Sequence, residues 1–172
     1  MESITKTERE CGLMKHAREP YASLGGGLNE HNDCVVRAFS LAGNLPYTRV
    51  HAVLAKHGRK RRGHTEYHVS ITAQEELFPH TKFRSTAQIA YGGTYNIIQS
   101  PTTVAFTKAH PVGRYICFTR THAFALIDGV VHDWKSCPRA RVKMYCQVSI
   151  GKQQSKRSLL QPQADTRILK LL

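Results

Sequence analysis

Three residues of this sequence carry side chains that can together perform nucleophilic catalysis: Cys34, His122 and Asp133. A thiol attacks a carbonyl carbon as its thiolate, an imidazole moves the proton, and a carboxylate holds the imidazole in one tautomer. Cys34 follows the polar run "NEHND" and opens an apolar pattern that is typical of a helix. Because a helix begins with unpaired N–H groups and the positive end of its dipole, this position stabilises a thiolate and can line an oxyanion hole.

The pairing of His122 with Asp133 rests on a predicted β-hairpin. The strand-like runs "HAFALI" (122–127) and "VVHDWK" (130–135) are joined by Asp128-Gly129, a strong signal for a two-residue turn. Such a turn pairs Ile127 with Val130, Leu126 with Val131, Ala125 with His132, and Phe124 with Asp133. Side chains alternate between faces, so His122 lies diagonal to Asp133, about 7–8 Å across the pair. The same register turns His132 to the other face and leaves Asp128 in the turn.

The elements that must position these residues follow from helix and strand signals. Asp33 is a suitable N-cap for a helix over "CVVRAFSLAG" (34–43), and as a cap it would turn its carboxylate away from the sulfur. Further helices are expected in "PYTRVHAVLAKHG" (46–58), "ITAQEELF" (71–78) and "PTTVAFTKAHP" (101–111), and further strands in "GRYICFTR" (113–120) and "RVKMYCQVSI" (141–150). They predict an α+β fold, in which the helix carrying the cysteine packs on a small antiparallel sheet carrying the histidine and the aspartate.

The composition fits one domain in a chain of 172 residues. Hydrophobic residues make up 41% of the chain, as in ordinary globular proteins, which argues against a wholly disordered protein. We expect an irregular arm over residues 1–28, the domain over 29–150 and a basic, polar tail over 151–172. The polar N-terminus and the lack of a long apolar window predict neither a secretory signal nor a membrane span. Five cysteines are an odd set, which favours reduced thiols in a cytoplasm over a disulfide framework.

A formal net charge of +13 indicates an anionic partner. The run "KHGRKRRGH" (56–64) concentrates this charge. Its cations are candidates to bind nucleic acid or an acidic protein: Lys56, Arg59, Lys60, Arg61 and Arg62. No aromatic residues alternate with them to stack on bases, and a charge run of this kind is usually a solvated loop.

Metal binding is the other chemistry suggested by ten histidines and five cysteines. His64 and His68 have the spacing of one helix face, and His132 precedes Cys137 by five positions. Neither pair is joined by a second close pair of ligands. We therefore expect no metal site and no cofactor.

The order of a cysteine opening a helix, a histidine on a strand and an aspartate on the next strand resembles the papain-like cysteine peptidase superfamily. The segments "NDCVVRAFSLAGNLPYTRVHAVL" (32–54) and "GRYICFTRTHAFALIDGVVHDW" (113–134) are similar to small phage and prophage proteins. Those proteins in turn resemble bacteriocin-leader-processing peptidases, with a looser likeness to ovarian-tumour-type deubiquitinases. The resemblance covers residues 29–58 and 101–135.

This resemblance implies a papain-like fold and a hydrolase of the peptidase or isopeptidase type. It implies Cys34 as nucleophile, His122 as general base and acid, and Asp133 as the orienting residue. The leader peptidases carry a glutamine oxyanion donor six positions before the cysteine, where this chain has Leu28. Asn29 and Asn32 are the candidates to donate in its place, beside the main-chain N–H of the cysteine. A phage protein of this kind would meet a protein or peptide substrate in the host cytoplasm or be associated with the virion.

Two other functions are open on the sequence. A basic protein of the same fold without turnover would bind nucleic acid, an acidic protein or a host protein. An acyl-enzyme can also pass its acyl group to an amine instead of water. For Cys34 alone a half-buried structural thiol is the simpler interpretation, and only its combination with the His122–Asp133 pair favours catalysis.

Overall fold

A computed structural model describes residues 14–25, 28, 30–86, 88–89 and 98–149, and its centre is one six-stranded sheet. The strands lie in the order β1-β7-β6-β5-β8-β2. Their bounds are β1 Lys15–Ala17, β2 Arg84–Ser85, β5 Arg114–Phe118, β6 Ala123–Ile127, β7 Val130–His132 and β8 Met144–Val148. β1 runs parallel to β7, and the other neighbouring pairs of this sheet are antiparallel. A separate two-stranded sheet joins β3 (Gln88–Ile89) to β4 (Ile98–Gln99).

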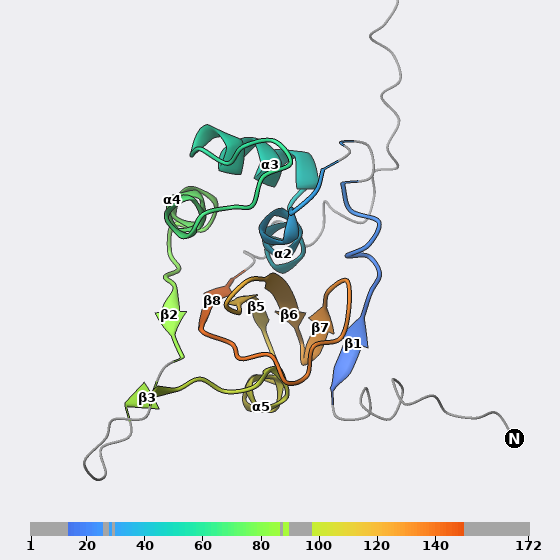
Figure 1. Cartoon of the computed structure of the whole chain (residues 1–172), viewed down its shortest axis with the longest axis vertical. Coiled ribbons are helices and arrows are strands. Elements are labelled where there is room, and N and C mark those ends of the chain that lie inside the picture. Colours follow the sequence, from blue (N-terminus) through green and yellow to red (C-terminus); the bar gives the residue numbers. More distant parts are fainter. Residues whose placement is uncertain (1–13, 26–27, 29, 87, 90–97, 150–172) are drawn as a thin grey trace, which may run out of the picture.

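Helices cover both faces of the central sheet. The described helices are α2 Cys34–Gly43, α3 Tyr47–Lys56, α4 Tyr67–Leu77 and α5 Thr103–Ala109. α2 lies directly on one face with α3 and α4 beyond it, and α5 lies on the opposite face (Figure 1). None of the described helices has the length and apolar character that crossing a bilayer requires.

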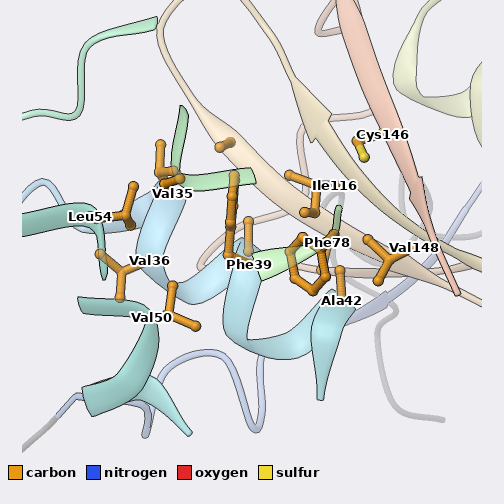
Figure 2. Packing of buried hydrophobic residues seen from close by; sticks show 14 of the residues in the cluster. Val35, Val36, Phe39, Ala42, Val50, Leu54, Phe78, Ile116, Cys146 and Val148 are labelled. Atoms are coloured by element: carbon orange, nitrogen blue, oxygen red, sulfur yellow. The ribbon is translucent and has the colours of Figure 1, made fainter. Parts of the chain in front are cut away.

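The apolar side of α2 anchors the helix to the sheet. Val35, Val36, Phe39 and Ala42 recur at helical spacing and are buried. Figure 2 shows the Phe39 ring lying between Ile116 of β5 and the rest of the helix layer, with Phe78 beside it. Because these side chains fix both the rotation and the height of α2, they also fix where its first residue lies.

Both faces of the sheet are buried, which explains the nearly continuous apolar run of β6. Ile116 on β5 and Ala125 on β6 belong to the core under α2. Their neighbours Cys117 and Phe124 point to the other face, where Phe106 of α5 covers them. Alternation along the strands therefore divides the core into two layers.

The α+β class and the predicted helices and strands are confirmed, with boundaries shifted by a few residues. The α4 helix begins earlier than expected, at Tyr67. The sheet is larger than predicted and mixed rather than purely antiparallel, because β1 joins it in parallel.

The irregular arm predicted over residues 1–28 is wrong where the structure describes it. β1 pairs with β7, and Met14 and Tyr21 are buried in the domain. The three-residue run "KHA" has no alternating pattern, and its partner strand lies far along the chain, so no local signal marks it. The preceding residues 1–13 and the tail predicted over 151–172 lie outside the described residues.

Candidate active site

The predicted hairpin is confirmed in register. The pairs Ile127–Val130, Leu126–Val131 and Ala125–His132 form as expected. Asp128 and Gly129 both have left-handed backbones, with φ of 47° and 76°, as a type I′ turn requires. The fourth expected pair, Phe124 with Asp133, is not part of the ladder because β7 ends at His132.

His122 directly precedes β6 and Asp133 directly follows β7, so both lie at the open end of the hairpin, and they bond directly to each other. His122 Nε2 lies 2.7 Å from Asp133 Oδ1. The carboxylate side chain is 1% exposed, whereas the imidazole is 32% exposed and reaches the surface. The Trp134 N–H also donates to Oδ1, at 2.6 Å, and the Asp133 N–H donates to Ala17 O of β1. A buried carboxylate held in this way fixes the orientation and the tautomer of the ring.

Cys34 is half-buried at the first position of α2 and lines the same cleft as His122. Because Nε2 bonds Asp133, Nδ1 is the ring nitrogen left to face the Cys34 side chain, which lies close enough to His122 to affect its pKa. Burial alone would lower the pKa of His122, but the hydrogen bonds and charges of Asp133 and Cys34 outweigh it and raise the pKa to about 10. The structure thus brings the three predicted residues together, with His122 next to both acidic groups.

We expect the His122 imidazolium to persist to about pH 10, and a histidine NMR titration measures this directly. The folded pKa lies above the ordinary value of 6.5, so the bonds of the imidazolium stabilise the fold fully below pH 6.5. That contribution is lost as the pH rises towards 10. A Cys34→Ala variant removes one of the two acidic partners, and its His122 should titrate at lower pH. A wild-type midpoint at the ordinary value would contradict the expectation.

Asp33 occupies the predicted N-cap position but does not cap α2. Its carboxylate accepts two bonds from Arg37 Nε, at 2.9 and 3.0 Å, and one from the Tyr47 hydroxyl at 2.7 Å. The predicted capping bond is therefore wrong, because a guanidinium one turn along the helix and a buried phenol take the carboxylate instead. The N–H groups beside Cys34 donate no bond to this side chain, so they are available to a substrate oxygen.

The two asparagines predicted as oxyanion donors have different outcomes. Asn29 lies outside the described residues. Asn32 lines the cleft beside Cys34, but its Nδ2 donates to the Arg62 carbonyl at 3.2 Å. Leu28, at the position of the glutamine in the leader peptidases, is apolar and 36% exposed. Neither Asn32 nor Leu28 therefore offers a free side-chain donor to an oxyanion.

A cleft of about 990 Å³ opens beside Cys34 and His122. Its walls come from the start of α2, the segment that leads into α4, and the turn between β5 and β6. Two exposed aromatic residues, Tyr67 and Trp134, stand among the lining residues. A cleft of this size is large enough for a few residues of an extended peptide.

The cations predicted to bind phosphate do not form one exposed surface. Lys56 pairs with Glu76 at 2.9 Å. Arg59 was expected to be exposed, but its side chain is fully buried and pairs with Glu30 at 2.9 Å. This part of the prediction is wrong, because the partner carboxylate lies at a distant position that a charge run does not reveal. The others predicted in this run, Lys60, Arg61 and Arg62, are exposed.

The loop that contains these cations also holds the segment before the cysteine. Arg59 Nη2 donates to the Glu30 carboxylate and, at 3.4 Å, to the His31 carbonyl. Glu30 Oε2 accepts from the Arg62 N–H at 2.9 Å, and Asn32 donates back to the Arg62 carbonyl. The loop over residues 59–62 is therefore part of the scaffold of Cys34.

The cleft is also lined by residues that were not predicted, among them Tyr21, Arg37 and Trp134. Arg37 lies four positions after Asp33, a spacing that indicates a helical ion pair and was available in the sequence. Tyr21 reaches the site only because β1 joins the sheet, and it had no local signal. Arg18 lies over the Trp134 ring at 4.2 Å, a contact that also depends on this strand.

No group of three histidine, cysteine, aspartate or glutamate side chains among the described residues is arranged to bind a metal ion. Comparisons with family models, curated proteins and solved structures give no match to this chain.

Proposed function

We propose that the protein is a cysteine hydrolase of the peptidase or isopeptidase type that forms an acyl-enzyme on Cys34. The observation that carries this proposal is that Cys34, His122 and the buried Asp133 lie together beside a cleft. An imidazole that lies beside a thiol and bonds a buried carboxylate is the arrangement that activates a nucleophile. We include in the proposal the papain-like resemblance and a phage origin, both of which are consistent with such a hydrolase.

The acylation step uses the three residues in turn. The Cys34 thiolate attacks the carbonyl carbon of an amide, a C–S bond forms, and the negative charge moves to the carbonyl oxygen. The His122 imidazolium gives its Nδ1 proton to the leaving nitrogen, and the C–N bond breaks. The amine departs and a thioester remains, while Asp133 holds the ring in place.

Deacylation returns the site to its first state. The now neutral His122 takes a proton from a water molecule, whose oxygen attacks the thioester carbon. The C–S bond breaks, which releases a carboxylic acid and restores the thiolate–imidazolium pair. An amine in place of water would give acyl transfer instead of hydrolysis.

Iodoacetamide is expected to alkylate Cys34 at least about ten times faster than the other described thiols, because a thiolate is the reacting species. Cys117 and Cys146 are buried and Cys137 is partly so, and burial raises the pKa of all three. Mass spectrometry of peptides after short exposures measures each rate.

The His122→Ala variant should slow the alkylation of Cys34 towards the rate of an ordinary thiol. His132→Ala is the matched control, because that histidine belongs to the same hairpin but bonds neither Cys34 nor Asp133 among the described contacts. Equal rates at the four described thiols, or equal effects of the two variants, would overturn the proposed nucleophile.

The alternative without turnover, a basic protein that binds nucleic acid or an acidic protein, has less support. Arg59 is used inside the fold and Lys56 is paired, so exposed charge in the loop falls to Lys60, Arg61 and Arg62. This alternative also assigns no role to the buried Asp133 beneath His122.

A further inference from the structure

The oxyanion formed during acylation needs a side-chain donor besides the main-chain N–H of Cys34. We propose that the Tyr21 hydroxyl is this donor, and that Tyr21 is therefore a catalytic residue. The inference rests on the hydrolase proposed above and assigns a role that none of the predicted residues fills.

Tyr21 is in the right place for this role. It is 2% exposed as a residue, yet it lines the same cleft as Cys34 and His122. Its hydroxyl lies near enough to Asp133 and to Cys34 for the charges of both to act on it. The phenol therefore lies close to the reacting pair, on the wall of the cleft that a substrate carbonyl would enter.

The hydroxyl of Tyr21 has no hydrogen-bond partner among the described residues, which distinguishes it from other buried tyrosines of this fold. The Tyr47 hydroxyl donates to Asp33, and the Tyr115 hydroxyl donates to the Val112 carbonyl at 2.9 Å. The Tyr21 hydroxyl is not among the fully buried unpaired atoms of the described residues, so it opens to the cleft. A substrate oxygen that becomes negative during the reaction would supply the missing acceptor, so the bond would be strongest in the transition state.

Tyr21 is also held rigidly to the helix that carries the nucleophile. Arg37 lies over its ring at 5.5 Å and donates to the carbonyls of Tyr21 and Ala22. The same guanidinium is bonded to Asp33, the residue before Cys34. Arg37 thus links the segment that carries Tyr21 to the start of the helix that carries Cys34. A donor held in this way needs no reorganisation when charge develops.

The phenol stays protonated over the whole range in which the site would work. Burial is the main cause that raises the pKa of Tyr21 above its ordinary value, and the negative charges of Asp133, Cys34 and Asp33 raise it further against the opposing effect of Arg37. A phenol in this state donates a hydrogen bond and does not act as a base.

The Tyr21→Phe variant separates this role from a structural one, because it removes the hydroxyl and keeps the ring. The first probe is p-nitrophenyl acetate, which acylates a thiolate through a tetrahedral oxyanion and releases p-nitrophenolate. The second is iodoacetamide, which the thiolate attacks by displacement of iodide without any oxyanion. Loss of one oxyanion donor lowers rates about 10²–10³-fold in amide hydrolysis, and we expect about ten- to a hundredfold for this reactive ester. The alkylation rate of Cys34 should not change.

Tyr115→Phe is the matched control, because it removes a buried tyrosine hydroxyl on the α5 side of the sheet. It should react as the wild-type protein does with both probes, and thermal unfolding verifies that both variants are folded. An unchanged acylation rate in Tyr21→Phe would overturn the inference. So would an equal loss in both reactions, which would mean that Tyr21 acts on the Cys34–His122 pair. If the wild-type protein itself shows no preferential reaction at Cys34, the proposed function fails first, and the inference fails with it.

Discussion

Asp133→Asn is expected to lower the rate of Cys34 acylation by p-nitrophenyl acetate at least about a hundredfold, because the charge that holds the catalytic imidazolium is lost. The amide oxygen can still accept from the Trp134 N–H, as Oδ1 does at 2.6 Å, so the local backbone should keep its shape. What disappears is the negative partner of His122, whose bond is the largest of the causes that raise the pKa of this histidine against the opposing effect of burial. The burst of p-nitrophenolate in a stopped-flow experiment measures the rate.

Asp128→Asn makes the same chemical change at the exposed turn of the hairpin and is the matched control. Asp128 Oδ1 accepts from the Gly113 N–H at 2.9 Å, and asparagine suits the left-handed backbone at φ of 47°. This control should acylate at the wild-type rate. Similar losses in the two variants would mean that general charge, and not the bond to His122, governs the reaction.

Arg59→Met is expected to lower the free energy of unfolding by about 3–5 kcal/mol, because it removes one partner of a buried ion pair. Glu30, whose side chain is 2% exposed, would keep its charge and lose the guanidinium that bonds it at 2.9 Å. Urea denaturation followed by circular dichroism measures the loss. Because the same guanidinium holds the segment before Cys34, the preferential alkylation of this thiol should weaken as well.

Arg61→Met is the control for the charge and size of that substitution. Arg61 is exposed in the same loop, and an exposed change of this kind usually alters stability by less than about 0.5 kcal/mol. If the two variants lower the free energy of unfolding by the same amount, the Arg59–Glu30 pair does not hold the loop. A large difference would show that the charge run contains a structural residue, whatever its exposed members bind.

The local parts of this fold could be predicted from the sequence, because their causes are local. The apolar spacing after Asp33 predicts α2, and Asp128-Gly129 predicts a turn whose length determines the register of β6 and β7. From that register the pairing of His122 with Asp133 follows, and the structure confirms the contact. The position of Cys34 at the start of a helix was predicted in the same way.

The remaining parts depend on residues that are far apart in the chain. The sequence does not show that "KHA" pairs with β7 and so brings Tyr21 to Cys34, or that Glu30 buries Arg59. It also indicates the wrong role for the Asp33 carboxylate, which prefers Arg37 and Tyr47 to the helix N–H groups.

By itself, then, the sequence determined the nucleophile candidate, its helix and the histidine–aspartate hairpin, because periodicity and turn chemistry act over a few residues. Only the tertiary structure decided what surrounds them: the phenol of Tyr21 in the cleft, the buried Arg59–Glu30 pair and the strand β1 at the edge of the sheet. The physical reason is that burial and ion pairing depend on which distant segments pack together, and a pattern of neighbouring residues does not contain that information.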